Sequence, residues 1–376
     1  MGASITLPGR PDPLEVPEPG WQAAYPPPVT RSVYAAAHVA AAPDGGIDWD
    51  ATLAFREHLW RHGFAVAEAM DTAQRGMGLR HDQALELIAR SAARAAQLGA
   101  AMAGGAGTDQ LPPGRHRPAA IIGAYAEQLA HVQDSGSEVI VMASRALAAS
   151  AVSASDYLEV YEQVVNLADR PVMLHWLGEA FDPALRGYWG AEDFAAAADT
   201  VIELLERAGG RVRGVKLSVL DQDCEIALRG RLPEGVRLYT GDDLHYAELI
   251  KGDASGHSDA LLGAFAAITA PAAAALHALD AGDLAGYDAA IGPTVALSRH
   301  IFEPPTYDYK AGIAFLAWLN GLQPHFAMLD GMQARRSAGH LVRVFELAVR
   351  ARALLDPELA VARMTEYLAG TAVSRR

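Results

Sequence analysis

The chain has a single cysteine, Cys224, and aromatic residues make up only 7% of its 376 positions. One cysteine excludes an internal disulfide bond and any zinc or iron–sulfur site built from several cysteines. Basic residues are also in the minority, with 31 Lys+Arg against 45 Asp+Glu and a formal net charge of −14. An acidic chain is repelled by nucleic acid and by anionic membranes, so we expect small molecules or further copies of the chain as partners.

Long hydrophobic stretches are missing as well. The longest uncharged run, residues 260–279, is mostly alanine and contains Pro271 and His277, which is too weakly apolar for a membrane span. The amino terminus has no basic segment followed by an apolar one, which predicts that there is no signal peptide. Together with the single cysteine, these features lead us to expect a cytoplasmic protein.

The pattern of the chain changes near residue 30. Residues 7–29 contain many prolines, which neither continue a helix nor donate to a sheet, so we expect residues 1–30 to form an extended arm. From residue 31 onward, short apolar runs alternate with amphipathic stretches, as in buried parallel strands covered by helices. The expected strands are 32–40, 64–70, 97–104, 137–143, 171–177, 212–218, 236–241 and 254–262.

Eight alternations of strand and helix close most simply as a (β/α)8 barrel, which we predict for residues 31–280. An open doubly wound sheet is the alternative, but no G-x-G-x-x-G follows the first strand, which argues against a dinucleotide site. Residues 281–376 are predicted to form a helical region that packs on the barrel. Such an extension caps a barrel or builds an interface between subunits.

The active site of a (β/α)8 barrel lies at the carboxyl ends of its strands. Lys216 lies in the apolar segment VRGVKLSV, inside a predicted buried strand. Lysine is rarely buried unless it is paired or functional, and desolvation favours the neutral amine, a nucleophile toward carbonyl carbon. We interpret Lys216 as a lysine that forms a Schiff base. The alternative is that it extends out of the strand end or pairs with a carboxylate such as Asp242.

Other polar residues lie near the predicted strand ends. His175, in PVMLHWLG on the neighbouring strand, is a candidate for proton transfer, although a histidine bonded within the core is the commoner case. One of the two aspartates of YTGDD is expected to cap the next helix. The candidates for binding substrate are Asp71, Thr72, Arg75, Arg145, Gly241, Asp242 and His257.

Several segments, in this order along the chain, resemble a known family. They are PDGGIDWDATLAFREHLWRHGF, GVKLSVLD, YTGDD, ALDAGDLAGYDAA and PPTYDYKAGIAFLAWLNG. These segments are similar to the first loop and helix, the lysine strand G-[IV]-K-D-[ST], the strand-7 motif S-G-x-D and the C-terminal helices of the dihydrodipicolinate synthase and N-acetylneuraminate lyase family. That family consists of aldolase barrels that form a Schiff base.

The resemblance implies that Lys216 is the Schiff-base lysine and that the protein is a homo-oligomer, a tetramer or a dimer. The chain also departs from the family. Its DTAQR segment keeps Thr72 of the family's G-T-T-G-E but has Ala73 and Arg75 in place of the second threonine and the acid. His175 replaces a tyrosine that transfers protons, and ASRALA replaces paired tyrosines. We therefore expect a divergent branch that acts on a different oxo compound.

The leading hypothesis is a lyase that needs no cofactor. Lys216 forms a Schiff base with a 2-oxo acid or a sugar-derived carbonyl compound, for cleavage or formation of a C–C bond or for dehydration. His175 transfers the proton, and Arg75 or Arg145 binds an anionic group of the substrate.

Two other hypotheses remain open. One is a sugar isomerase or aldolase that depends on a divalent metal held by Glu68, Asp71, His175 and Asp242. The other is a barrel that binds a ligand without converting it, since function is decided by the site and not by the fold.

Overall fold

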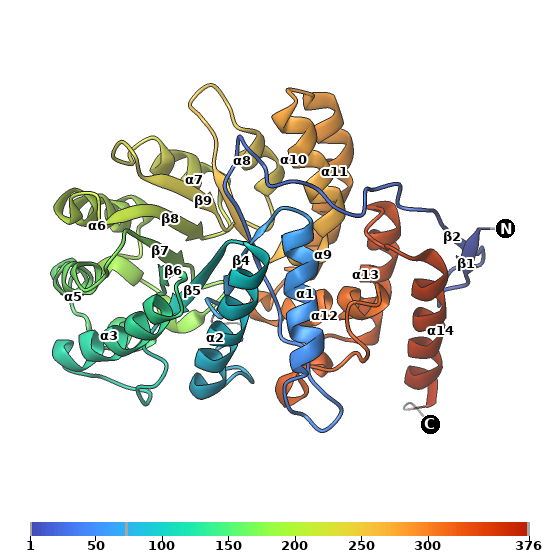
Figure 1. Cartoon of the computed structure of the whole chain (residues 1–376), viewed down its shortest axis with the longest axis horizontal. Helices are drawn as coiled ribbons and strands as arrows, with labels where there is room; N and C mark the ends of the chain where they lie inside the picture. Colours follow the sequence, from blue (N-terminus) through green and yellow to red (C-terminus); the bar gives the residue numbers. More distant parts are fainter. Residues whose placement is uncertain (1, 72–73, 374–376) are drawn as a thin grey trace.

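The computed structural model describes residues 2–71 and 74–373, which form a barrel with helices around it and further helices at one side (Figure 1). Eight parallel strands close in the order β10-β3-β4-β5-β6-β7-β8-β9. Their bounds are β3 (Val33–Ala36), β4 (Ala65–Glu68), β5 (Met102–Ala106), β6 (Glu138–Val141), β7 (Val172–Leu177), β8 (Val212–Ser218), β9 (Arg237–Thr240) and β10 (Asp259–Leu262). The predicted (β/α)8 barrel is confirmed.

The helices that cover the strands alternate with them along the chain. They are α1 (Trp49–Arg61), α2 (His81–Leu98), α3 (Pro118–Asp134), α4 (Arg145–Ser150), α5 (Ala154–Asn166), α6 (Phe194–Ala208), α7 (Gln222–Arg229), α8 (Tyr246–Lys251) and α9 (Ala264–Ala267). Further helices follow: α10 (Thr269–Asp280), α11 (Leu284–Ile301), α12 (Lys310–Leu319), α13 (Ala338–Arg350) and α14 (Pro357–Val373).

Two strands begin later than the sequence pattern predicts. Helix α2 continues to Leu98 and ends at Gly99, whose φ of +63° suits glycine, so β5 starts only at Met102. Before β10, residues 253–256 form a tight turn closed by hydrogen bonds between Asp253 and Gly256. In both places, the residues predicted as strand include the end of the preceding helix or turn.

The amino-terminal segment is more structured than an extended arm. Two short strands, β1 (Ala3–Ile5) and β2 (Leu14–Val16), form an antiparallel hairpin beside α14 (Figure 1). Farther along, the Trp21 indole donates to the carbonyl of Arg352 at 2.7 Å, and the buried Tyr25 ring lies 6.0 Å from the ring of His277. The segment therefore connects the barrel with the C-terminal helices. Helices α10 and α11, on either side of residue 280, pack on each other. The division of the chain into an arm, a barrel and a C-terminal helical region, with boundaries at residues 30 and 280, therefore stays a proposal.

The interior of the barrel is closed at its amino-terminal end. Arg213 pairs there with Glu138 at 2.8 Å, and the hydroxyls of Tyr34 and Tyr239 join this pair by hydrogen bonds. Above this polar layer, small and apolar side chains from all around the sheet form a second layer, which includes Ile140. Among the described residues, this layer and the apolar layer above it lie between the amino-terminal end and Lys216, so a ligand would approach from the carboxyl ends of the strands.

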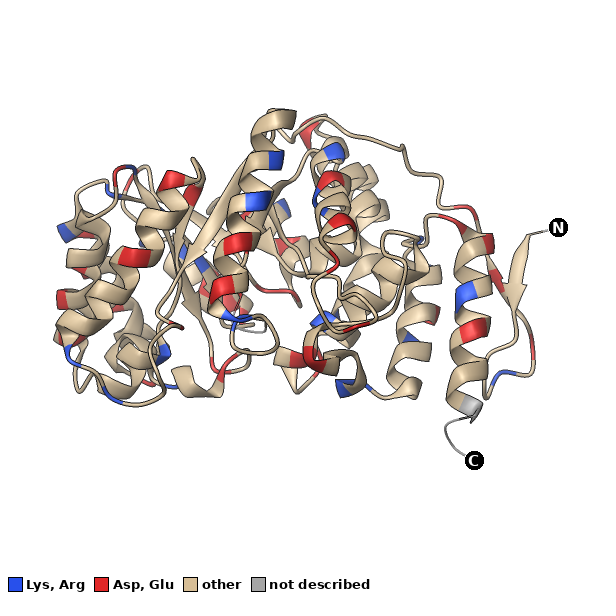
Figure 2. Ribbon diagram, turned by 60° about the horizontal axis from the view of Figure 1, so that its bottom comes forward, with Lys and Arg blue, Asp and Glu red and all other residues tan. Residues whose placement is uncertain are grey.

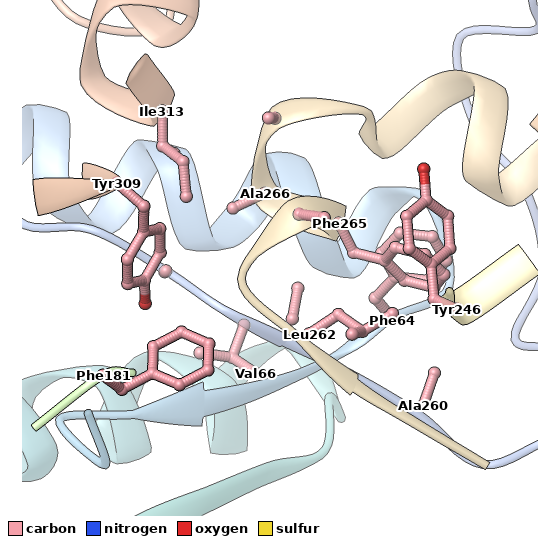
Figure 3. Packing of buried hydrophobic residues seen from close by; sticks show 14 of the residues in the cluster. Phe64, Val66, Phe181, Tyr246, Ala260, Leu262, Phe265, Ala266, Tyr309 and Ile313 are labelled. Atoms are coloured by element: carbon pink, nitrogen blue, oxygen red, sulfur yellow. The ribbon is translucent and has the colours of Figure 1, made fainter. Parts of the chain in front are cut away.

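The C-terminal helices cover that other end on one side. Helix α12 is buried along its whole length and packs against α9, α13 and α14. Figure 3 shows Tyr309, just before α12, with its hydroxyl directed away from Ile313 and toward the ring of Phe181, while Phe265 of α9 lies beside Phe64. This packing fixes the first residues of α12 against the strand ends.

The charged residues follow the pattern expected from the composition. Figure 2 shows Lys and Arg interspersed with Asp and Glu along the outer helices. Of the helices in the described ranges, none has the length and the apolar character to cross a bilayer.

Arg56 and Glu68 form a buried ion pair behind the sheet. The guanidinium contacts both carboxylate oxygens, at 2.8 and 2.9 Å, and the Ser91 hydroxyl donates to Glu68 at 2.7 Å. Glu68→Gln leaves the Arg56 charge buried without its partner, so we expect a loss of about 3–5 kcal/mol in the free energy of unfolding, measured in urea.

The matched control is Glu86→Gln, which breaks an exposed pair with Arg90 on α2 and is expected to cost about 0.5 kcal/mol or less. Equal losses for the two variants would contradict the structural importance of the buried pair.

Candidate active site

Lys216 of β8 lies inside the barrel. In the register of the sheet it stands between His175 on β7 and Tyr239 on β9. Its Nζ atom is 3.8 Å from the sulfur of Met70, and the side chain is buried. Gly241 provides the space, because a Cβ at that position would lie only 2.8 Å from Lys216 Cε. The expected burial of Lys216 is observed, while its role in catalysis stays a prediction.

The surroundings of Lys216 make the amine easier to deprotonate than that of an exposed lysine. Burial lowers the pKa of Lys216 to about 8, although the carboxylates of Asp71 and Asp243 oppose this shift, and the charge of Lys310 adds to it. With such a pKa, roughly a tenth of the Lys216 amine is neutral at pH 7, whereas an exposed lysine is almost entirely protonated. The site therefore contains a nucleophilic amine at physiological pH.

Asp71 is held in this site by two consecutive residues from the start of α12. The Tyr309 hydroxyl donates to Asp71 Oδ2, and Lys310 Nζ lies 3.6 Å from the same oxygen. Lys310 is itself buried and donates to the carbonyls of Ala36 and Ala37 at the end of β3. Burial lowers the pKa of Lys310, while the charge of Asp71 raises it. The C-terminal helices thus supply a second buried amine.

Asp243 is the other carboxyl group near Lys216. It follows β9 and is buried, with one oxygen accepting a hydrogen bond of 2.7 Å from the backbone of Ala264. Burial raises the pKa of Asp243 to about 8, although the charge of Lys216 lowers it. The carboxyl group is therefore mainly protonated at pH 7 and can donate a proton.

His175 stands next to Lys216 across the sheet. Its Nε2 lies 3.2 Å from the Ser218 hydroxyl, and the side chain is buried. Burial first, and then the charge of Lys216, lower the pKa of His175 well below its usual value. A hydrogen-bond interaction with the Met70 backbone raises the pKa in part, but the imidazole stays neutral at pH 7.

Asp242 turns away from this group. Its carboxylate accepts hydrogen bonds from the backbone of Leu244 and His245 and contacts His245 Nδ1 at 2.8 Å. These contacts shape the turn before α8, which matches the capping role expected for one of the two aspartates. The neighbouring Asp243 occupies the place beside the lysine that the sequence led us to expect for Asp242.

Arg75 lies near the site but has no donor left for a substrate. Its five N–H groups contact Asp109, Gln128 and the carbonyls of Ala69 and Gly105. The guanidinium therefore links the ends of β4 and β5 by hydrogen bonds. The expectation that Arg75 binds a substrate anion is not supported by this geometry.

Arg145, in contrast, lies at the mouth of the barrel at the start of α4. Its Nε donates to Asp182 at 2.6 Å, and its side chain is 42% exposed. It lines a cavity of about 430 Å³ at the ends of β5 and β6. This position fits the expected role in binding an anionic group.

Two other expected site residues have different outcomes. His257 precedes β10, so it lies at the amino-terminal end of the barrel, and its position contradicts the expected contact with substrate. The predicted strand 254–262 includes His257, but β10 begins only at Asp259. Thr72 lies outside the described residues.

The four residues that the alternative hypothesis names as metal ligands, Glu68, Asp71, His175 and Asp242, do not all lie around one point. Glu68 points out of the barrel to Arg56, and Asp242 is bonded within its turn. Within the described residues, the group that could hold a metal ion is His300, Glu303 and His340, whose ligand atoms lie within 4.8 Å of one another. This group lies on the C-terminal helices and not around Lys216.

Sequence reasoning missed Lys310 and Tyr309, and it did not choose between the two aspartates. A signal for Lys310 was present, because it stands in YDYKAGIAFLAWL, where a lysine among apolar residues suggests burial as it does for Lys216. The choice of Asp243 depends on the turn after β9, which the sequence pattern does not specify.

The fold and the site define a class: (β/α)8 barrels with a buried lysine on the sixth barrel strand. Residues 13–373 match the model of a family described as "Protein of unknown function (DUF993)", and the chain belongs to this family. A search of curated proteins finds no match.

Solved structures of the dihydrodipicolinate synthase family share the fold. The synthase from Aquifex aeolicus has a TM-score of 0.66 and 15% identity, over 87% of this chain and 99% of that chain. A prophage protein of the family from E. coli K12, in complex with pyruvate, has a TM-score of 0.64 and 16% identity, over 85% and 99%. The synthase from Acinetobacter baumannii, also complexed with pyruvate, has a TM-score of 0.64 and 15% identity, over 86% and 99%. The resemblance expected from the sequence is confirmed at the level of the fold.

The arrangement of charges predicts a pH dependence. Lys310→Met removes a positive charge that lowers the pKa of Lys216, so the pKa of Lys216 should rise from about 8, by up to about one unit. The measurement is NMR titration of lysines carrying ¹³C-methyl groups introduced by reductive methylation. Lys251→Met, which removes an exposed lysine paired with Asp288, is the control and should leave the Lys216 signal unchanged. An unchanged pKa in Lys310→Met would contradict the proposed coupling.

Proposed function

We propose that the protein is a lyase of the aldolase type that forms a Schiff base between Lys216 and a 2-oxo acid. The observation that carries the proposal is the buried Lys216 amine, with a pKa of about 8, inside the barrel and next to His175 across the sheet. The fold shared with structures of the dihydrodipicolinate synthase family, two of which were solved with pyruvate, supports the same class of chemistry.

In the first step, the neutral Lys216 amine attacks the carbonyl carbon of the substrate. The carbonyl oxygen takes up protons and leaves as water, so a C=N bond replaces the C=O bond. Asp243, protonated at neutral pH, is the acid for this step. The carboxylate it becomes is stabilised by the positive iminium beside it.

The iminium then withdraws electrons from the adjacent carbon atoms. This permits loss of a proton or cleavage of a C–C bond, and the reverse of either step. His175 is buried next to Lys216 across the sheet, so it is placed to hold or move a proton in the role we expected from the sequence. Its low pKa suits it as a neutral hydrogen-bonding group and as a weak base.

Lys310 and Asp71 have a supporting role in this scheme. Lys310 keeps the pKa of Lys216 low, and Asp71 balances the charge of Lys310 across 3.6 Å. The Lys310 charge also offers attraction to a substrate carboxylate. The site works without a metal ion or an organic cofactor in this proposal. The homo-oligomer implied by the family resemblance stays a prediction.

Chemical trapping tests the Schiff base. Incubation with pyruvate or a longer 2-oxo acid, followed by borohydride, should reduce the iminium to a secondary amine, and mass spectrometry with peptide mapping should find the adduct on Lys216. Lys216→Ala should give no adduct and no turnover. Lys216→Arg should fail as well, because a guanidinium stays protonated.

The exposed Lys251 provides the control, and Lys251→Ala should form the adduct on Lys216 as the unchanged protein does. Turnover that persists in a folded Lys216→Ala protein would overturn the proposal.

A further inference from the structure

A cavity of about 430 Å³ opens at the mouth of the barrel, beside the site of Lys216. The loop after β5 and the first turns of α4 form its walls, and most of the wall is apolar. The apolar lining residues are Leu111, Pro112, Pro113, Met142, Ala143, Ala146, Ala149 and Ala184. A volume of this size holds a small organic molecule or the arm of a larger substrate.

Two methionines separate this cavity from Lys216. Met70 contacts the Lys216 amine, and Met142 lines the cavity. Gly105 lies between them, because a Cβ there would be 2.7 Å from Met70 Cα and 2.8 Å from Met142 Sδ. Methionine side chains are unbranched and adapt readily to a ligand. A substrate can thus extend from the amine into the cavity when these side chains repack.

Arg145 is the cation that the cavity offers to a ligand. Its Nε is bonded to Asp182, while its two terminal nitrogens have no partner among the described residues. The guanidinium lies close to Gly76, where a Cβ would be 3.0 Å from Arg145 Nη1. Arg75 also lines the cavity, but its donors are all engaged. Arg145 can therefore pair with a substrate carboxylate through its terminal nitrogens, beside the apolar part of the wall.

The other polar groups of the described lining are already bonded. The Thr108 hydroxyl is 2.7 Å from the Ser144 hydroxyl, and the Asp109 carboxylate contacts Arg75 and Gln128. A substrate arm with several hydroxyl groups would leave some of them unpaired, which weakens binding. An apolar arm fits the wall better.

We infer that this cavity is the distal substrate subsite, and that it takes the apolar arm of a 2-oxo acid whose far end carries a carboxylate paired with Arg145. The inference rests on the proposed function, since it assumes that the carbonyl end of the substrate reaches Lys216. It narrows the substrate class from any oxo compound to 2-oxo dicarboxylic acids with a mainly hydrocarbon chain.

The test compares three six-carbon probes by borohydride trapping on Lys216: 2-oxoadipate, 2-oxohexanoate and 2-keto-3-deoxygluconate. We expect half-maximal trapping at a concentration at least about tenfold lower for 2-oxoadipate than for the other two. Arg145→Gln should remove this preference, and Arg145→Lys should keep part of it. The matched control is Arg186→Gln, which changes an exposed arginine paired with Glu192 and should leave the preference unchanged.

A second variant tests the cavity itself. Ala149 is exposed at the rim and lines the cavity, so Ala149→Phe should fill it without disturbing the core. We expect trapping of 2-oxoadipate to weaken at least about tenfold, while trapping of pyruvate, which is too short to reach the rim, stays within about twofold.

Calorimetry separates failure of the inference from failure of the proposed function. Lys216→Ala cannot form an iminium but keeps the cavity, so it should still bind 2-oxoadipate, and adding Arg145→Gln should weaken that binding. Pyruvate trapping with no preference among the six-carbon acids would overturn the subsite and leave the Schiff base intact. Absence of any adduct, with binding that depends on Arg145, would overturn the Schiff base alone. Binding that does not depend on Arg145 would overturn the subsite.

Discussion

The burial of the Lys216 amine is the constraint on which the site depends. A charged amine in a closed barrel is costly unless other charges accompany it or it gives up its proton. In this site burial lowers the pKa of Lys216 to about 8, so the proton is lost more easily, and the carboxyl groups of Asp71 and Asp243 lie near the amine. Gly241 has no side chain because one would occupy the space of the lysine chain. The nearby carboxyl groups and the glycine at position 241 can thus be explained by the need to accommodate an amine at this place.

The burial of charged groups near Lys216 also explains why the C-terminal helices contribute residues to the site. Tyr309 and Lys310 come from the start of α12, far from the barrel strands in sequence, yet both contact Asp71. Helix α12 is apolar on every side and packs among α9, α13 and α14, so its first residues are held rigidly over the end of β3. The helical extension therefore positions two charged or polar groups of the site, in addition to covering the barrel.

The sequence predicts the barrel well, because strands buried on both faces leave an apolar run, even where the run also covers part of the preceding helix or turn. It also predicts the burial of Lys216, since a lysine inside such a run has few explanations. It does less well where the outcome depends on a turn or a long-range contact. Asp242 and Asp243 are adjacent, and only the turn after β9 decides which one faces inward. Arg75 looks available in the sequence, but its donors are taken up by four residues: Ala69 after β4, Gly105 in β5, Asp109 after β5 and Gln128 in α3.

The charges near Lys216 also bear on how a Schiff base could form in so closed a space. In the reactive form, which holds the roughly one tenth of Lys216 that is neutral at pH 7 together with a protonated Asp243, neither group carries a charge. Condensation with a carbonyl compound then creates a positive iminium and a negative Asp243 carboxylate together, as an adjacent pair. The net charge of the enclosed site does not change, so the low dielectric of the barrel, which would resist a single new charge, stabilises the pair that is formed. The opposite charges of Asp71 and Lys310 lie 3.6 Å apart and compensate each other. The new ion pair therefore has no unbalanced charge from these two residues beside it.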